Sequence, residues 1–473
     1  MLRRAWFVAW MLGLGGCFWL GAAMADEPKA PTEETPDLID EATPPAAEAP
    51  TSQEKDDAEY YELFKVLADT MDQVERNYVK DISRRELMEA AIRGLLDKLD
   101  PYSNYISPEE IDRFKTSVES QFGGIGIQVD MRQGRLLIVS PLVGSPAYRA
   151  GLQAGDMIVE IEGKSLDGVS LDEAISRMKG EAGTSVTITV LSRGGERRTL
   201  TLTREMIRME TVRGDRRNDE DRWDFMLDQD RKIGYIRLDS FSRETYRDLQ
   251  RAMQELEKQQ LRGLVIDLRF NPGGLLTSAV EVADLFLPEG EIVSTAGRNS
   301  PKRSWTARKP GTYEGFPMAV LVNRGSASAS EIVSAALQDH KRAVVIGERT
   351  WGKGSVQNVI ELEGGKSALK LTTAGYQRPN GHNIHRAPDA KESDEWGVLP
   401  DPGFEVKLDD KEIGALFEHR RKRDILLVNH SVKPKEDGPP PESGKTEGPT
   451  SDFVDRQLQK ALEYLSGELA KAQ

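Results

Sequence analysis

A serine-rich turn between two regular segments is the first place in this sequence that could carry chemistry. The apolar run Met318–Val322 is typical of a buried strand, and Ala329–Leu337 is typical of a helix. A serine at the start of such a helix lies beside backbone amides that have no partner within the helix, and these could stabilise an oxyanion formed by nucleophilic attack. Serine is also a common helix cap, so this segment alone does not distinguish a nucleophile from a cap. It leaves three candidates open: Ser326, Ser328 and Ser330.

A serine nucleophile needs a base, and histidine is the usual one. None of the five histidines lies in a glycine-rich or acidic setting that indicates a catalytic base. His382 and His385 are three residues apart and could in principle bind a metal. No third ligand accompanies them, which favours a surface loop and predicts no metal site.

A lysine can replace histidine when burial lowers the pKa of its amine toward neutrality. Lys353 lies between two glycines and beside a tryptophan, and Gln357 follows four residues later, where it could orient the amine by a hydrogen bond. A phosphate-binding loop is excluded because the Walker spacing is absent. An ordinary solvated lysine is the alternative that this segment alone leaves open.

The segments around these residues predict an α/β layer. From Lys232 onward, strand-like and helix-like patterns alternate, as in sheets that are covered by helices. The expected strands are Ile233–Leu238, Leu264–Leu268 and Met318–Val322, and the expected helices run from Ser242 to Gln260, from Thr277 to Phe286 and over Ala329–Leu337.

A second unit precedes this layer, and its run Ser145–Gly163 resembles PDZ domains. Turn and strand signals place the unit at residues 118–205. In such a domain an extended peptide adds a strand to the sheet edge, and its terminal carboxylate docks on free loop amides. The expected peptide-binding residues are Gly123, Gly124, Ile125, Gly126, Ile127 and Val129, whereas Leu152 is expected to pack in the core.

The N-terminus has the pattern of an export signal. Two arginines precede the apolar stretch Ala5–Ala22, and Ala23–Ala25 fits a cleavage site, so we predict a signal peptide over residues 1–25. An uncleaved membrane anchor and a lipoprotein signal at Cys17 are the alternatives. Cys17 is the only cysteine, so a chain cleaved after this segment has no disulfide and no thiolate nucleophile.

The remaining segments connect these units. Residues 26–57 are rich in Pro, Ala, Glu and Thr and predict a disordered linker, as does the polar segment 431–452. Between the linker and the PDZ unit we expect a helical region, residues 58–117, whose first helix carries an apolar seam that faces either the core or another subunit. The catalytic layer spans 206–405 with a final part over 406–430, and a helix is expected over 453–473.

The composition excludes one class of function. The 473 residues carry a net charge of −14, whereas a nucleic-acid-binding surface needs clustered lysine and arginine. We therefore expect no nucleic acid among the partners.

Three motifs in order resemble the C-terminal processing proteases, which are serine–lysine peptidases with a PDZ domain. They are the PDZ run, Asp267–Gly274, and the serine turn followed by Gly352–Gln357. The resemblance implies a PDZ domain inserted before a crotonase-like α/β peptidase core, in a multidomain α/β chain with an N-terminal helical region and a C-terminal helix. It makes Ser328 the nucleophile and Lys353 the general base. It implies no metal and no organic cofactor.

The resemblance also supplies further site residues. Gln357 is implied to align Lys353, and the oxyanion donors are implied to be the amide of Ala329 and that of either Gly273 or Gly274. A PDZ residue that gates the active site, often arginine in the family, falls on Lys179, which cannot reproduce an arginine fork. The charged segment from Asn383 to Glu395 is longer than is usual in the family.

The implied function is that of an exported, periplasmic serine endopeptidase that cuts proteins near exposed, apolar C-termini. Helices at both ends indicate a homo-oligomer, and the need for an adaptor protein stays open. Two other functions compete with this one: an inert PDZ scaffold, and an acyl-CoA enzyme suggested by the crotonase-like layer alone.

Overall fold

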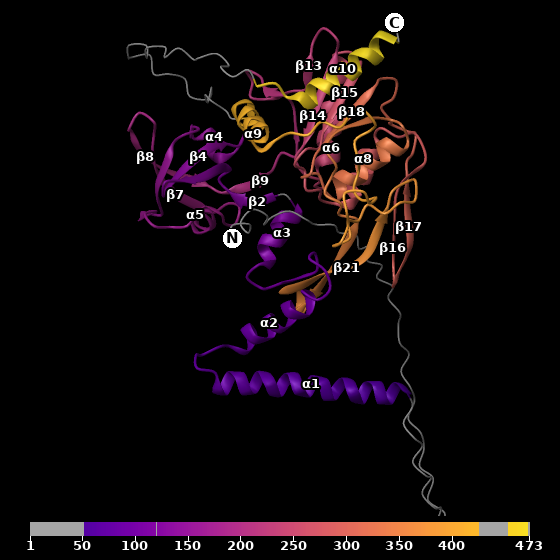
Figure 1. Cartoon of the computed structure of the whole chain (residues 1–473). Coiled ribbons are helices and arrows are strands. Elements are labelled where there is room, and N and C mark those ends of the chain that lie inside the picture. Colours follow the sequence, from indigo (N-terminus) through magenta and orange to yellow (C-terminus); the bar gives the residue numbers. More distant parts are fainter. Residues whose placement is uncertain (1–51, 120, 425–452, 472–473) are drawn as a thin grey trace, which may run out of the picture.

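The structure is a computed structural model in which residues 52–119, 121–424 and 453–471 are described (Figure 1). The predicted signal peptide, residues 1–25, and the predicted flexible segment 431–452 lie outside the described residues. The predicted linker 26–57 is described only from Ser52, where helix α1 (Ser52–Asn77) begins, so this helix starts earlier than the pattern predicted. Within the described ranges, no helix is both long and apolar enough to span a membrane.

A six-stranded sheet forms the centre of the peptidase core. Four of its strands, β14, β15, β18 and β19, are parallel. Two of them have the bounds that the sequence pattern predicted. The order is β10 (Val212–Arg213), β14 (Ile233–Leu238), β15 (Gly263–Asp267), β18 (Met318–Val322) and β19 (Val344–Gly347), and β13 (Met226–Asp228) also pairs with β14.

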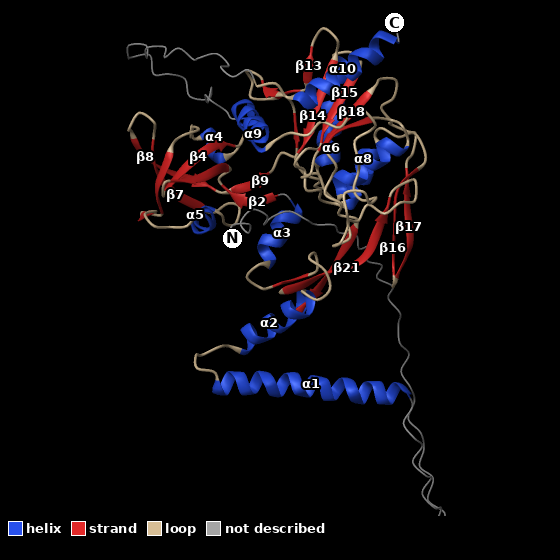
Figure 2. Cartoon of the chain, viewed as in Figure 1, coloured by secondary structure: helices blue, strands red, loops and turns tan. Residues whose placement is uncertain are grey.

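Helices cover both faces of this sheet, which explains why its strands are apolar throughout. Ile266 and Val320 face three helices on one side, whereas the alternate residues Val265 and Leu321 face the C-terminal helix on the other side. Figure 2 shows this layering. The helices on the first side are α6 (Thr245–Lys258), α7 (Leu276–Asp284) and α8 (Ala329–Asp339), and the C-terminal helix is α10 (Arg456–Lys471).

A second, antiparallel sheet was not predicted from the sequence. It has five strands and joins the N-terminal region to the core, because β1 pairs with β21. Its strands are β1 (Asn104–Ile106), β21 (Ser367–Gln377), β16 (Glu291–Gly297), β17 (Ser300–Thr306) and β20 (Ser355–Leu362), the last of which pairs with β21 and is followed by the 3₁₀ turn η1 (Glu363–Gly365).

The PDZ unit is a separate six-stranded sheet with its own core around Ile138, Leu152 and Ile188. Leu152 is fully buried, as expected of a core residue. The elements of the unit are β3 (Ile127–Arg132), β4 (Arg135–Pro141), α4 (Pro146–Arg149), β5 (Met157–Ile161), β6 (Lys164–Ser165), α5 (Leu171–Met178), β7 (Ser185–Leu191) and β8 (Arg197–Thr203). Short pairs flank it: β2 (Gln121–Gly124) with β9 (Glu205–Arg208), and β11 (Arg216–Arg217) with β12 (Trp223–Asp224).

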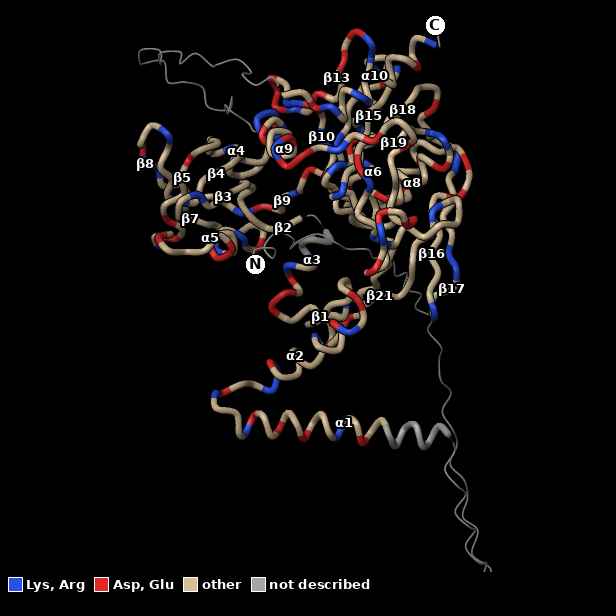
Figure 3. Tube along the Cα trace, viewed as in Figure 1, with Lys and Arg blue, Asp and Glu red and all other residues tan. Residues whose placement is uncertain are grey.

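The N-terminal helices precede the PDZ unit, and α1 extends away from the rest of the molecule (Figure 1). Helix α2 (Arg84–Leu96) begins with a capping box, in which Ser83 and Glu86 satisfy each other's backbone amides. Helix α3 (Ile111–Glu119) and helix α9 (Asp410–Asp424) complete the described elements. Acidic and basic residues alternate over much of the described trace, and the last turn of α9 is basic (Figure 3).

Candidate active site

The turn before α8 presents Ser328 in a backbone conformation that is rare for serine. Its φ is 56° and its ψ is −112°, and it is 5% exposed. Its two neighbours hold the turn in place: the Ser326 hydroxyl donates to the carbonyl of Leu268 at 2.8 Å, and the Ser330 hydroxyl donates to the carbonyl of Asn271 at 2.9 Å. The hydroxyls of Ser326 and Ser330 are therefore committed to the backbone, which singles out Ser328 among the three candidates.

The buried carboxylate of Glu331 connects the serine turn to the lysine loop, and sequence reasoning did not assign it a role. Its Oε2 accepts the amides of Ser328 and Lys353, each at 2.8 Å. Its Oε1 accepts the amide of Gly352 at 2.7 Å and the hydroxyl of Thr350 at 2.5 Å. Burial raises the pKa of Glu331, and these hydrogen bonds oppose that shift. Because all four partners donate, they match an ionised carboxylate. The amides of Ser328 and Lys353 share one oxygen atom of this carboxylate, which holds the two backbone segments close together.

The amine of Lys353 is in an environment that favours its neutral form. The residue is 2% exposed, and burial, with the charge of Lys370 second, lowers its pKa to about 7. Glu331 and Asp100 oppose that shift. The Nζ atom lies 5.2 Å from the ring centroid of Tyr102. A substantial fraction of the amine is thus uncharged at neutral pH, as a general base requires.

The hydroxyl of Ser328 is close to Tyr376 in this structure. Burial raises the pKa of the Tyr376 phenol to about 12, and a hydrogen-bonding contact with Ser328 opposes that rise. The backbone of Tyr376 donates to the carbonyl of Gly354 at 2.8 Å, so this residue contacts both the serine and the lysine loop. Among the described residues, no hydrogen bond joins Ser328 Oγ to Lys353 Nζ. The two side chains must therefore reorient to exchange a proton.

Gln357 was expected to align Lys353 but makes other contacts here. It is buried on β20, and its amide nitrogen donates to the hydroxyls of Ser355 at 2.9 Å and Thr372 at 3.2 Å. Its side chain therefore bonds Ser355 and Thr372, and not the amine of Lys353, in this arrangement.

The two candidate oxyanion glycines differ in their surroundings. A Cβ on Gly273 would lie 2.8 Å from Ser328 Cβ and 2.9 Å from the amide nitrogen of Ala329. A Cβ on Gly274 would instead meet the backbone of Phe241. Gly273 is thus the glycine that packs against the serine and the Ala329 amide. Its own amide donates to Asn271 Oδ1 at 2.9 Å, so that hydrogen bond must break before it can serve an oxyanion.

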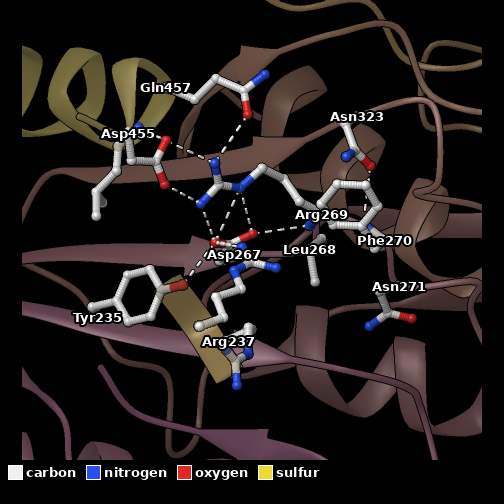
Figure 4. A network of polar contacts seen from close by, with 12 residues as sticks. Tyr235, Arg237, Asp267, Leu268, Arg269, Phe270, Asn271, Asn323, Asp455 and Gln457 are labelled. Atoms are coloured by element: carbon white, nitrogen blue, oxygen red, sulfur yellow. Dashed lines mark hydrogen bonds and ion pairs between the residues drawn. The ribbon is translucent and has the colours of Figure 1, made fainter. Parts of the chain in front are cut away.

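A buried ionic network anchors the strand end from which the Asn271–Gly274 turn begins (Figure 4). The guanidinium of Arg269 contacts Asp267 and two residues at the start of α10, Asp455 at 2.8 and 2.9 Å and Gln457 at 3.0 Å. Tyr235 donates to Asp267 at 2.7 Å. Neighbouring arginines hold the pKa of Asp267 below its usual range despite its burial. The start of the C-terminal helix is thereby tied to the strand end that precedes the Asn271–Gly274 turn.

Two of the expected PDZ loop residues lie in a strand. Gly123 and Gly124 belong to β2 and pair with β9, where the chain enters and leaves the domain. Ile125 and Gly126 alone therefore connect β2 to β3. Ile125 is buried in the PDZ core, and Ile127 and Val129, both on β3, pack partly against the same core. The expected loop is therefore shorter than predicted, and its hydrophobic residues serve the domain interior.

Lys179 caps the C-terminal end of α5, and its contacts lie within the N-terminal half of the molecule. Its Nζ is 4.9 Å from the ring centroid of Phe122, and burial, with the charge of Arg113 second, lowers its pKa. The structure therefore places this expected gating residue against β2 and near α3, and not against the serine or the lysine.

Comparisons with known proteins agree with this architecture. Residues 232–401 match peptidase family S41, residues 137–192 match the PDZ domain, and residues 14–110 match the N-terminal domain of the activating protease CtpB. The carboxy-terminal-processing protease of Bartonella bacilliformis is 36% identical over 422 residues, which is 87% of this chain and 90% of that protein. The carboxy-terminal processing protease CtpA of Bacillus subtilis is 33% identical, over 86% of this chain and 89% of that protein.

The chain belongs to the carboxy-terminal processing proteases of peptidase family S41.

This processing protease also resembles a solved structure. The photosystem II D1 C-terminal processing protease is 29% identical, with a TM-score of 0.42 and coverage of 77% of this chain and 99% of that chain. The resemblance to the protease family and the multidomain α/β organisation expected from the sequence are confirmed.

Sequence reasoning missed several residues of the processing protease's site. One had a local signal: Ser328 and Glu331 have the spacing of a capping box. Tyr102 had none, because the pairing of β1 with β21 that brings it to the site joins segments more than 260 residues apart. Tyr376 lies on β21 opposite Thr295 of β16, a pairing that no local pattern indicated.

Proposed function

We propose that this processing protease is an exported, periplasmic endopeptidase in which Ser328 is the nucleophile and Lys353 the general base. We further propose that it cuts protein substrates near apolar C-termini that its PDZ domain binds. The observation that carries the proposal is the shared anchor: Glu331 fixes the backbone of both residues, and burial brings the pKa of Lys353 to about 7.

The chemistry follows from these groups. The neutral amine of Lys353 takes the proton of Ser328 Oγ as that oxygen attacks the scissile carbonyl. The amide of Ala329 and a glycine amide of the Asn271–Gly274 turn stabilise the oxyanion, and loss of one such donor typically costs about 10²–10³ in rate. The lysine ammonium then protonates the leaving amine. Neutral Lys353 then takes a proton from water as the water attacks the acyl-enzyme, and its ammonium returns that proton to Ser328 Oγ as the acyl bond breaks.

Substrate recognition and export are supported by sequence and homology. An extended peptide can add to the free edge of β3, since that strand has a partner only in β4 within the described sheet. The N-terminal pattern of residues 1–25 supports export, and the chain's curated relatives are bacterial processing proteases. The exposed apolar side chains of α1 support self-association.

The test uses the purified chain without its first 25 residues and a protein substrate with an apolar C-terminus. We expect Ser328→Ala and Lys353→Ala each to reduce cleavage at least 10³-fold, and cleavage by the native enzyme to rise with pH through about 7, because only the neutral amine can act as base. Masking the substrate C-terminus should raise KM. Undiminished cleavage by Ser328→Ala would contradict this mechanism, whereas absence of cleavage by the native chain would favour the inert scaffold.

A further inference from the structure

A turn from the N-terminal helical region, residues 100–103, lies against the side chain of Lys353. Strand β1 follows it directly and pairs antiparallel with β21, with Asn104 opposite Lys370 and Ile106 opposite Ala368. The turn lies outside the stretch that matches peptidase family S41, which begins at residue 232.

Asp100 organises this turn and links it to the predicted lysine-aligning residue. Its Oδ1 accepts the amides of Tyr102 at 2.7 Å and Ser103 at 2.9 Å, and its Oδ2 accepts the hydroxyl of Ser103 at 2.8 Å. The hydroxyl of Thr372 on β21 donates to Oδ1 at 3.1 Å and accepts from the amide nitrogen of Gln357 at 3.2 Å. A continuous chain of hydrogen bonds therefore runs from Asp100 to Gln357.

Tyr102 forms a surface against which the lysine amine rests. Lys353 Nζ lies 5.2 Å from its ring centroid, within the range of a cation–π contact. The indole nitrogen of Trp351 donates to the Tyr102 hydroxyl at 3.4 Å, and the ring of His385 lies 6.2 Å away in an edge-on orientation. Trp351 and His385 thus contact the Tyr102 side chain, and the amine of Lys353 lies over the face of its ring.

Three charged groups from different parts of the chain affect the pKa of Lys353. Glu331 of α8 and Asp100 of the turn favour the ammonium, and Lys370 of β21 disfavours it. The pKa of His385 is lowered, first by burial, so this group adds little positive charge at neutral pH. Asp100 is therefore the negative group that the N-terminal region contributes to this balance.

We propose that Asp100 and Tyr102 are positioning residues for the general base, so that the N-terminal region completes the active site of the peptidase core. Tyr102 holds the amine of Lys353 in the resting position from which it moves to reach Ser328, and Asp100 fixes both the turn that carries this ring and, through Thr372, Gln357. The inference rests on the proposed Ser–Lys mechanism. A peptidase core without residues 100–103 would keep both members of the dyad and lose the surface that holds the amine.

The test measures kcat and KM against pH for Asp100→Asn, Tyr102→Leu and Tyr102→Phe in the otherwise full chain. Removing the charge of Asp100 favours the neutral amine, so the midpoint of the rise in kcat should move to lower pH, by on the order of 0.5–1 unit. Tyr102→Leu should lower kcat about tenfold or more with little change in KM, whereas Tyr102→Phe keeps the ring and should retain most of kcat. Asp97→Asn, an exposed aspartate three residues earlier, is the matched control and should leave the profile unchanged.

The outcomes separate this inference from the proposed function. If Lys353→Ala is inactive while Asp100→Asn keeps the native midpoint and Tyr102→Leu keeps the native kcat, the dyad stands and the positioning role is wrong. If Lys353→Ala retains activity, the proposed function itself fails. Poor folding of Tyr102→Leu does not spoil the test, because the midpoint for Asp100→Asn does not depend on how much of the protein is active.

Discussion

At the scale of single residues, the buried amine of Lys353 destabilises the fold that it serves. Its pKa in the native state is about 7, below the usual 10.5. Between these two pH values the unfolded chain holds a proton at this lysine that the native chain does not. The free energy of unfolding therefore falls as the pH falls from about 10.5 to about 7, and this contribution is constant below the native pKa.

Replacing the lysine by an apolar side chain of similar length should remove this cost. We expect Lys353→Met to be inactive and more stable than the native chain at pH 7. Its advantage should grow by on the order of 3 kcal/mol as the pH is lowered from about 9.5 to 7, and then level off. Urea unfolding at several pH values measures this, with Lys366→Met on the protein surface as the control. An advantage that is independent of pH would contradict the buried neutral amine.

The candidate catalytic residues were easier to find in the sequence than the residues that surround them. Ser328 and Lys353 lie in glycine-rich and serine-rich turns whose composition is unusual in itself. Glu331 was legible in principle, because serine and glutamate three residues apart form a capping signal. The role of Asp100 could not be predicted from the sequence, because its contact with Thr372 depends on a pairing between strands more than 260 residues apart.

At the scale of elements, the start of helix α10 contacts the end of the strand that leads into the Asn271–Gly274 turn. The guanidinium of Arg269 is almost fully buried, and Asp267, Asp455 and Gln457 together satisfy it (Figure 4). A buried ion pair adds little net stability compared with an apolar pair, but removing one partner leaves a buried charge uncompensated. The docking of α10 is therefore coupled to the geometry of the turn that follows Arg269.

Asp455→Asn tests this coupling with almost no change in shape. We expect a loss of about 2–4 kcal/mol in the free energy of unfolding, because Arg269 loses one of its two carboxylate partners. We also expect a lower kcat with KM little changed, since the oxyanion turn is affected and the PDZ domain is not. Glu463→Gln removes the same charge from the exposed side of α10 and should alter neither quantity. Equal stability and equal kcat of the two variants would show that the contact between Arg269 and Asp455 has no effect on the Asn271–Gly274 turn.

The elements themselves were predicted unevenly, for physical reasons. The parallel strands β14 and β18 are buried on both faces, so they read as continuous apolar runs and their bounds were predicted correctly. Strand β17 is largely exposed and carries lysine and arginine, so it has no apolar pattern to detect. Strand β21 is only partly buried along most of its length, so it has no clear apolar pattern. Its partner β20 directly precedes it, but its other partners, β1 and β16, are distant in sequence.

At the scale of the whole molecule, α1 is exposed to an extent that a solitary chain does not explain. Its apolar seam includes Tyr60, 56% exposed, and Phe64, 54% exposed, with ring centroids 4.9 Å apart. Its neighbours Leu63, Val66 and Leu67 are 63%, 62% and 41% exposed. Exposed apolar stripes of this kind mark contact surfaces, and a helix extended from the body can pair with the same helix of a second copy.

The whole-molecule prediction is that α1 holds a homo-oligomer together. We expect the chain without its first 25 residues to sediment as an oligomer. The double variant Tyr60→Lys, Phe64→Lys should sediment as a smaller species, because two charges in an apolar contact each cost several kcal/mol unless paired. Glu62→Lys with Asp69→Lys changes the charge of the same helix more strongly without removing an aromatic ring, and should leave the assembly intact. If both double variants keep the native sedimentation coefficient, the contact lies elsewhere.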